Sequence, residues 1–492
     1  MMTHTTFIAG RKLAPTHLGR VLVLGLGTSG KAVAHYCLDT VPDRVDGLVV
    51  AAGACSRAAQ AEAVQLEAAG ASVFFDQYAI EGEFDLCIAS PGISPFSDFY
   101  LSAARAATEV ISEVEFAWRE SRVSTRWIAV TGTNGKTTTT ACAAHLLQSG
   151  GIRALAVGNI GDTCIAAVAA DEAEVFVAEV SSYQLASTVH FAPQVAVLLN
   201  ITPDHIKWHK THEAYVAAKL RVFANLAQVD QAVCVLDATN EEVRKQVKVF
   251  RAQTAQQRGF SYIPLGCAAG LHASMRVACG SENAAYVAEE MLRVEYNGAC
   301  YDLLRQDQLQ IKGEHNTSNA LAASAAALAL GLDVQSLRRG LLTFAPLEHR
   351  MEACGSIAGV CCYNDSKATN VDATLKALAA FGEARPIVLL GGDDKGTDLA
   401  TLVSAANEHC KAVVCFGAAG KRFLEAFSEA SCPHFLAAHL ENALDCALDQ
   451  AIKGDIVMLS PACASFDEFT CFEQRGDAFK QLVAARAKTR GI

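Results

Sequence analysis

The sequence lacks the features of several protein classes. Its N-terminus has no signal-peptide core, and its longest uncharged apolar-rich run, Asn319–Leu332, is too short to span a bilayer. Its 18 cysteines include no CxxC pair and no regular Cys/His spacing, so a zinc site is not expected. We therefore expect a soluble, cytoplasmic protein whose cysteines are small buried side chains in a reducing compartment.

Basic residues are scarce relative to acidic ones. The chain has 41 Lys and Arg against 52 Asp and Glu, a net charge of -11, whereas a nucleic-acid-binding surface needs clustered cations. Its 492 residues are 51% hydrophobic, with a mean hydropathy of +0.21, which is enough for several cores. At about 150 residues per domain, this length predicts about three domains.

The most informative stretch is Trp127–Ser149. A short apolar run predicts a buried strand, the turn Gly132–Thr137 (GTNGKT) follows, and an Ala/Leu-rich helix then runs to Gly150. Such a turn can form a phosphate cradle, in which backbone N–H groups and Lys136 face the phosphates and Thr137 ligates Mg²⁺. The alternative is an ordinary strand-to-helix turn. We interpret the stretch as an ATP site.

An earlier glycine turn indicates a second ligand site. Residues 21–52 predict a βαβ unit with GLGTSG (Gly25–Gly30) after its first strand. An NAD site needs an acidic residue after the second strand, where this chain has Ala51–Gly53, so we favour a diphosphate ligand other than NAD. The turn Ser90–Pro95 follows another strand, either as part of a ligand site at the same sheet edge or as a simple tight turn.

Polar residues interrupt or follow the next apolar strands. Glu179 lies inside the run FVAEVSSYQL and predicts either a Mg²⁺ ligand or a buried partner of a lysine. His205 follows the strand Val195–Leu199, a position that favours a functional histidine over a structural one. Lys219, flanked by alanines in a helix predicted over His212–Asn225, by itself indicates a surface charge.

The remaining chain predicts further α/β structure. A hairpin around Asn297-Gly298 should complete the central sheet, and a helix with Thr317 or Ser318 as its cap should follow EHNTSN. Beyond Leu347, four apolar strands each end in a polar or glycine-rich motif, which predicts one crevice along a parallel sheet. These motifs are residues 364–370, 391–396, 417–422 and 460–467.

In this order, the motifs resemble the Mur ligase superfamily over nearly the whole chain. TGTNGKTT, EHNTSN and the HR of EHRME are typical of the superfamily, and EVSSYQL, NDSKATN and SPACASFDEFTCFEQRGDAF of its D-glutamate-adding branch. The resemblance implies an α/β fold of three domains: a Rossmann-like UDP-binding domain (1–121), a central ATP-binding domain (122–346) and a Rossmann-like amino-acid-binding domain (347–492). Two departures are AAGACSR after the second strand, where relatives read uracil, and Lys207, where an acidic residue is common.

The resemblance also implies an activity. The enzyme would use ATP and two Mg²⁺ ions to add D-glutamate to UDP-N-acetylmuramoyl-L-alanine through an acyl phosphate, in peptidoglycan precursor synthesis. It would be a monomer that neither binds nucleic acid nor inserts into membranes. The alternatives are a sister ligase for another amino acid, a non-catalytic nucleotide-binding relative, and a nicotinamide-dependent oxidoreductase.

The same resemblance assigns residues to three sets. The catalytic set would be Lys136, Glu179, His205 and Lys219; the last three, with Thr137, would ligate metal, Lys219 as a carbamate rather than as a surface charge. The ATP set would be Gly132, Thr133, Asn134, Gly135, Lys136, Thr137, Thr138, Asn316, Asn319, Arg350 and Asp365. The substrate set would be Thr28, Ser29, Ser90, Gly92, Asn159, Ser181, Gln184, Lys367, Thr369, Lys395, Ser465, Phe466 and Phe472.

Overall fold

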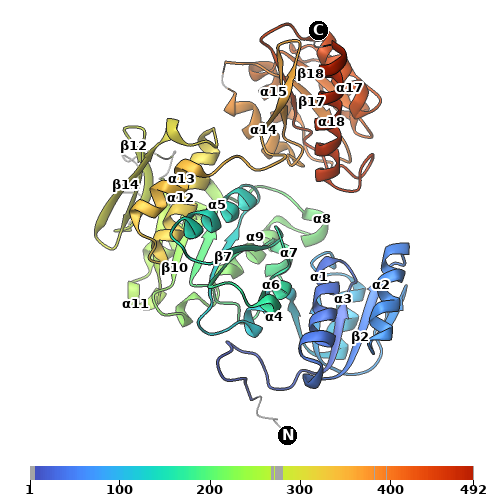
Figure 1. Cartoon of the computed structure of the whole chain (residues 1–492), viewed down its shortest axis with the longest axis vertical. Coiled ribbons are helices and arrows are strands. Elements are labelled where there is room, and N and C mark those ends of the chain that lie inside the picture. Colours follow the sequence, from blue (N-terminus) through green and yellow to red (C-terminus); the bar gives the residue numbers. More distant parts are fainter. Residues whose placement is uncertain (1–5, 267–270, 272–280, 382, 395, 491–492) are drawn as a thin grey trace. The chain divides into compact units, whose positions relative to one another are not determined.

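A computed structural model describes residues 6–266, 271, 281–381, 383–394 and 396–490 of the chain. The chain divides into two compact units, the first formed by Met1–Leu309 with Ser318–Thr343 and the second by Gln310–Thr317 with Phe344–Ile492. The first unit contains two β-sheets and the second contains one (Figure 1). The predicted α/β class, with Rossmann-like N- and C-terminal domains around a central P-loop ATPase-type domain, is confirmed by the three largely parallel sheets.

The N-terminal sheet is parallel and has the strand order β3-β2-β1-β4-β5. Its strands are β1 (Gly19–Leu24), β2 (Val45–Gly53), β3 (Ser72–Phe75), β4 (Phe84–Ala89) and β5 (Ala107–Ser112). Its helices are α1 (Thr28–His35), α2 (Arg57–Ala68), α3 (Asp98–Ala106) and α4 (Glu113–Glu120). The strand order reverses beside β1, and ligands of doubly wound sheets bind at the carboxyl edge at that point.

The central sheet has nine strands in the order β14-β13-β12-β11-β10-β9-β6-β8-β7. The strands from β6 to β12 are parallel: β6 (Arg126–Thr131), β7 (Ala154–Gly158), β8 (Val175–Glu179), β9 (Val195–Leu198), β10 (Val233–Asp237), β11 (Ser261–Leu265) and β12 (Ala284–Ala288). Strands β13 (Met291–Tyr296) and β14 (Ala299–Arg305) extend it as an antiparallel hairpin. Asn297 and Gly298, with φ of 51° and 77°, form the predicted turn.

Helices surround the central sheet. They are α5 (Lys136–Ser149), α6 (Cys164–Ala170), α7 (Ser182–Leu185), α8 (Ile206–His209), α9 (His212–Leu220), α10 (Glu241–Ala252), α11 (Ala255–Arg258), α12 (Glu314–Ala329) and α13 (Val334–Thr343). Five of the six residues of β6 are buried, as is typical of a parallel strand in an α/β sheet. One buried apolar cluster runs from the N-terminal sheet into the central sheet, with Val21 and Trp127 among its members.

The second unit contains a six-stranded sheet in the order β15-β16-β20-β17-β18-β19. Its strands are β15 (Glu352–Ile357), β16 (Val360–Asn364), β17 (Ile387–Gly391), β18 (Ala412–Phe416), β19 (His434–Leu436) and β20 (Ile456–Leu459), and only β15 is antiparallel to its neighbour. Its helices are α14 (Val371–Ala380), α15 (Ala400–His409), α16 (Gly420–Ala426), α17 (Leu440–Gln450) and α18 (Phe472–Arg490). Two separate apolar cores pack against the sheet, one including α14–α16 and the other α17 and α18.

Two sequence predictions about helices were wrong. The helix after EHNTSN does not begin beyond a cap at Thr317 or Ser318: α12 already begins at Glu314, behind Gly313 with a φ of 93°. The Ser318 hydroxyl instead donates a hydrogen bond to Asp237 Oδ2 at 2.5 Å. The helix predicted over His212–Asn225 ends at Leu220. Within the described ranges, no helix combines the length and apolar character that crossing a membrane requires.

Candidate active site

The glycine turn between β6 and α5 has the backbone geometry of a phosphate cradle. Gly135, the N-cap of α5, has a φ of 84°, and a Cβ atom there would lie 2.4 Å from Asn319 Oδ1. Only glycine is compatible with this conformation and this close approach. Lys136, Thr137 and the buried Thr138 follow in the first turn of α5, where backbone N–H groups and the helix dipole favour an anion.

Residues at the carboxyl end of β9 hold the cradle in place. Asn200 accepts a hydrogen bond from the Asn134 backbone N–H at 2.8 Å and donates one to the Asn134 carbonyl at 3.0 Å. The Thr133 hydroxyl lies 2.8 Å from the Tyr215 hydroxyl, from helix α9. The cradle is therefore fixed by two neighbouring elements. Tyr215, 1% exposed, was not singled out from the sequence, because its partner is distant along the chain.

Two lysine side chains bond to neighbouring carbonyls of this turn. Lys136 Nζ donates to the Thr133 carbonyl at 2.8 Å, and Lys219 Nζ donates to the Gly132 carbonyl at 2.7 Å. Lys219 is only 2% exposed. Burial, and next the charge of Lys136, hold the pKa of Lys219 well below its ordinary value. The structure thus places a buried amine of lowered pKa directly beside the cradle, where sequence alone indicated a surface charge.

Glu179 ends β8, the strand beside β6, and its carboxylate is 1% exposed. Oε1 accepts a hydrogen bond from Asn159 Nδ2 at 3.1 Å. Oε2 is buried and has no hydrogen-bond partner among the described residues. An unsatisfied buried carboxylate oxygen is costly unless a cation binds it, and carboxylates are preferred Mg²⁺ ligands, so the residues present fit this ion.

His205, in the segment after β9, has an unusual backbone conformation. Its φ of 55° places it in the left-handed region, which is uncommon for residues other than glycine. The Tyr183 hydroxyl lies 2.7 Å from its Nδ1, and Asp204 Oδ2 lies 3.5 Å from its Nε2. Both Asp204 and Glu179 also act electrostatically on Lys219. The structure therefore brings together the predicted catalytic residues of the central sheet.

The donor set does not form a complete metal cage. Within the residues that the structure describes, no three His, Cys, Asp or Glu side chains are grouped so that they could hold a metal ion. Mg²⁺ in phosphate-transfer sites commonly has only one or two carboxylate ligands and completes its shell with phosphates and water. The geometry thus suits an ion that arrives with a phosphate ligand.

Three residues of the predicted substrate set lie near Glu179. Asn159 follows β7 and makes the hydrogen bond to Glu179 described above. Ser181 is the N-cap of α7, and its hydroxyl accepts a hydrogen bond from the Gln184 backbone N–H at 3.2 Å. The Gln184 side chain in turn accepts one from the Ser181 backbone N–H at 2.9 Å. This reciprocal capping box fixes the start of a helix of only four residues.

A buried histidine was missed by sequence reasoning. His209 is 1% exposed, and its Nε2 lies 2.9 Å from the hydroxyl of Ser182, which adjoins the cap of α7. Burial, followed by the charge of Lys219, lowers the pKa of His209 to about 4, so the ring is neutral. The sequence signal that could have identified His209 is the histidine-rich run HIKWHKTH, which begins at His205.

The predicted uridine-diphosphate residues lie at the carboxyl edge of the N-terminal sheet. Thr28 and Ser29 open α1 behind the glycine turn. Ser90 follows β4, and its hydroxyl donates to the Gly25 carbonyl at 3.1 Å, which ties together the turns after β1 and β4. Gly92 lies in the second of these turns. The four residues therefore gather at one sheet edge.

Asn316 and Asn319, predicted near the adenine, both lie in α12, but Asn316 belongs to the second unit and Asn319 to the first. Asn316 Nδ2 donates to the Lys312 carbonyl at 2.8 Å. Asn319 Oδ1 accepts from the Thr139 hydroxyl at 3.3 Å, which links α12 to the cradle helix α5.

In the second unit, Asp365 follows β16 and is buried. Its Oδ2 accepts from the Ser460 hydroxyl at 2.7 Å, and its Oδ1 from the Met351 backbone N–H at 3.3 Å. Burial raises the pKa of this carboxyl to about 7, an effect that the charge of Arg350 partly offsets. Arg350 and Asp365, both predicted to contact the nucleotide, are therefore neighbours.

Of the predicted D-glutamate residues, Lys367 and Thr369 lie in the loop after β16, Ser465 and Phe466 lie in the loop after β20, and Phe472 is the first residue of α18. Lys367 Nζ lies 3.7 Å from the centre of the Phe472 ring, a cation–π contact, and the Thr369 backbone N–H donates to the Lys367 carbonyl at 2.8 Å. Ser465 is 2% exposed, whereas Phe466 is 69% exposed. Lys395 lies outside the described residues.

Arg475, in α18, joins these two loops and was missed by sequence reasoning. Its guanidinium, 1% exposed, donates to the Ser366 hydroxyl at 2.9 Å and to the carbonyls of Ser366, Cys463 and Ala464 at 2.8–3.1 Å. Burial lowers the pKa of Arg475 to about 10, so it remains charged. In a sequence, an arginine in a helix usually indicates a surface charge. Only the position of Arg475 in the FEQRG run indicated a buried role.

Comparisons with known proteins agree with this architecture. Residues 130–327 match the family model described as "Mur ligase middle domain", and residues 349–463 match "Mur ligase, glutamate ligase domain". The UDP-N-acetylmuramoylalanine--D-glutamate ligase of Koribacter versatilis is 36% identical over 485 residues, which cover 95% of this chain and 98% of the relative. The protein of the same name from Thermoanaerobacter pseudethanolicus is 36% identical over 474 residues, 94% and 98% of the two chains.

Solved structures share the fold at lower identity. UDP-N-acetylmuramate-alanine ligase MurC from Thermotoga maritima has a TM-score of 0.55 at 17% identity and covers 95% of this chain and 99% of its own. MurF from Acinetobacter baumannii has a TM-score of 0.56 at 18% identity, with 83% and 91% of the two chains covered.

Proposed function

This chain belongs to the Mur ligase family, and we propose that it is the cytoplasmic ligase that adds D-glutamate to UDP-N-acetylmuramoyl-L-alanine with ATP. Relatives that carry this activity in their names align over nearly their whole length. The structural observation that carries the proposal is the cradle after β6, with the buried carboxylate of Glu179 and the buried amine of Lys219 beside it.

We propose three domains with the boundaries 1–121, 122–346 and 347–492. The five-stranded sheet would bind the uridine diphosphate, the nine-stranded sheet ATP, and the six-stranded sheet the amino acid. The matched family segments, 130–327 and 349–463, fall within the second and third of these ranges and support the assignment.

ATP phosphates would lie on the cradle. Backbone N–H groups at the start of α5 and the ammonium of Lys136 would contact the phosphate oxygens, and the Thr137 hydroxyl, Glu179 and His205 would hold Mg²⁺. The ion, when bound, offsets the negative charge that the transferring phosphate develops. Lys136 would exchange its present bond to the Thr133 carbonyl for the phosphate.

The reaction would take place in two steps. A carboxylate oxygen of the substrate's L-alanine attacks the γ-phosphorus of ATP, the bond to ADP breaks, and an acyl phosphate forms. The amine of D-glutamate then attacks the acyl carbon, loses a proton, and expels inorganic phosphate as the amide forms. The chain's main contribution would be to hold the three reactants in line and to keep water from the acyl phosphate.

Lys219 would act as a carbamate. A neutral amine attacks the carbon of CO₂ and loses a proton, which leaves an N-carboxylate anion able to serve as a metal ligand. Burial and the charge of Lys136 lower the pKa of Lys219, which favours the unprotonated amine that this reaction requires.

The incoming D-glutamate would bind in the second unit. Lys367, Thr369, Lys395 and Ser465 would hold its two carboxylates, with Phe466 and Phe472 as the apolar walls, and Arg350 and Asp365 would contact the nucleotide. The positions of Lys367 and Ser465 on loops joined by Arg475 support this set.

Phosphate release tests the proposal. Purified protein would receive ATP, Mg²⁺ and UDP-N-acetylmuramoyl-L-alanine, with D-glutamate, L-glutamate or no amino acid. We expect sustained release only with D-glutamate. Release with another amino acid would identify a sister ligase, and no release in any mixture would contradict the proposed function.

A further inference from the structure

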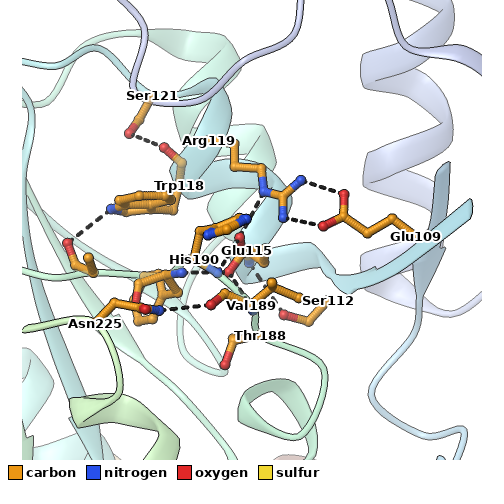
Figure 2. A network of polar contacts seen from close by, with 12 residues as sticks. Glu109, Ser112, Glu115, Trp118, Arg119, Ser121, Thr188, Val189, His190 and Asn225 are labelled. Atoms are coloured by element: carbon orange, nitrogen blue, oxygen red, sulfur yellow. Dashed lines mark hydrogen bonds and ion pairs between the residues drawn. The ribbon is translucent and has the colours of Figure 1, made fainter. Parts of the chain in front are cut away.

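A fully buried carboxylate links the N-terminal sheet to the central one. Glu115, in the first turn of α4, is 0% exposed. Its oxygens accept hydrogen bonds from the backbone N–H groups of Val189, His190 and Phe191 at 3.1, 3.0 and 2.7 Å. Three consecutive N–H groups that converge on one anion form a nest, which is specific for a negative charge (Figure 2).

Further contacts hold Glu115 in place. Arg119, one turn later in α4, donates from Nε to Glu115 Oε1 at 2.8 Å, and its other two nitrogens form a fork with Glu109 at 2.7 Å (Figure 2). Trp118 Nε1 donates to the Ala192 carbonyl at 3.2 Å. Four hydrogen bonds thereby offset the cost of burying the Glu115 charge. Helix α4 contacts the segment 186–192, which follows α7 in the chain, at several points.

The same segment is also bound by residues that follow α9, the helix that carries Lys219. Arg221 donates to the Ala186 and Thr188 carbonyls at 2.7 and 2.9 Å. Asn225 donates to the Val189 carbonyl at 2.8 Å. Arg221 and Asn225 follow directly behind α9, so the segment lies between α4 and the end of α9.

The segment also continues α7. The backbone N–H groups of Ser187 and Thr188 donate to the carbonyls of Gln184 and Leu185, the last residues of α7. Because α7 has only four residues, contacts beyond its own backbone must fix its orientation, and the segment supplies these at the C-terminal end of the helix.

We propose that Glu115 is a positioning residue of the ligase: through the nest at residues 189–191 it orients α7 for the muramoyl substrate. The inference rests on the proposed function, which assigns Ser181 and Gln184 to that substrate. The class of ligand is a nucleotide-linked acyl sugar, which would contact α7 while its uridine diphosphate lies on the N-terminal sheet. Glu115 thus couples the two halves of one substrate site.

The test uses Glu115→Gln, which keeps the shape but removes the charge that three N–H groups share. The Michaelis constant for UDP-N-acetylmuramoyl-L-alanine should rise about tenfold, since hydrogen bonds to a charged group are the strong ones, while those for ATP and D-glutamate stay within about twofold. Hydrogen exchange at the amides of residues 189–191 should become faster.

Glu120→Gln is the matched control. Glu120 lies at the other end of α4 and is 1% exposed, and among the described residues its carboxylate accepts hydrogen bonds from Arg44 and Tyr36. The change should lower the melting temperature and leave all three Michaelis constants unchanged. If Glu115→Gln does not fold, Asn225→Ala disturbs the same segment from its other side and should raise the same constant about threefold.

The inference would be overturned if folded Glu115→Gln had an unchanged Michaelis constant for UDP-N-acetylmuramoyl-L-alanine. Where Glu115→Gln does not fold, an unchanged constant in Asn225→Ala would overturn it. An equal rise of this constant in Glu120→Gln would also overturn it. Absence of turnover in the unmodified protein would instead reject the proposed function. Failure of the inference is therefore measured in the variants, and failure of the proposed function in the unmodified protein.

Discussion

A lysine with almost no exposed surface is costly to keep charged, and Lys219 is such a residue. We predict that Lys219→Ala lowers kcat by about 10²–10³-fold, because the variant would lack the anion that the proposed carbamate supplies. Added bicarbonate should not restore activity, whereas short carboxylates such as formate should restore part of it. Full activity in Lys219→Ala would contradict the proposed carbamate. Lys248→Ala, which changes an exposed lysine, is the control and should keep full activity.

Glu113 provides a second test at a single residue. Its Oε1 accepts from the Ile165 backbone N–H at 2.7 Å, its Oε2 has no partner among the described residues, and burial raises its pKa to about 7 from 4.5. The folded chain therefore binds this proton more tightly than the unfolded chain. The stability linked to it is fully present below about pH 4.5 and is lost as the pH rises through about 7.

Glu113→Gln should remove this dependence. We expect wild type and variant to melt at similar temperatures near about pH 4.5, and the variant to melt about 2 °C or more higher near about pH 8. Thermal unfolding followed by circular dichroism measures the difference. If the melting temperatures of wild type and variant differed by the same amount at every pH in this range, Glu113 would not titrate there.

Among the elements, the loops after β16 and β20 depend on one buried side chain. Arg475→Lys keeps the charge but cannot reproduce four hydrogen bonds from a planar guanidinium. We predict that the Michaelis constant for D-glutamate rises at least about tenfold, while that for UDP-N-acetylmuramoyl-L-alanine changes by less than about twofold. Equal effects on both constants would mean that Arg475 has only a general role in folding.

The features that the sequence predicted correctly depend on neighbouring residues. The glycine turn before Lys136 and the hairpin at Asn297-Gly298 are specified by residues that accept a positive φ, and each signal lies within a few positions. The parallel strands of all three sheets follow from apolar runs of the length of a strand. Local pattern was sufficient for these elements.

The features that were missed depend on contacts between distant segments. Tyr215 bonds to Thr133 and Arg475 to Ser366, partners that lie 82 and 109 positions away. The start of α12 was misplaced because Ser318, a good local cap, bonds to Asp237 of β10 instead. Tertiary contacts of this kind leave no periodic signal in a single sequence.

For the molecule as a whole, the division into two units has a measurable consequence. The second unit has its own sheet and two apolar cores, so residues 344–492 should fold alone with a cooperative thermal transition. Circular dichroism of this fragment should show mixed α/β structure. A fragment that unfolds without cooperativity would mean that this part of the chain needs residues 310–317 or the first unit for its stability.

The central claim is that the substrate's carboxylate is phosphorylated before the amide forms. The most direct test uses UDP-N-acetylmuramoyl-L-alanine with ¹⁸O in the alanyl carboxylate, together with ATP and D-glutamate. The account predicts ADP, inorganic phosphate that carries one ¹⁸O atom per turnover, and an amide that keeps the other. Unlabelled phosphate, or AMP and pyrophosphate in place of ADP, would contradict it.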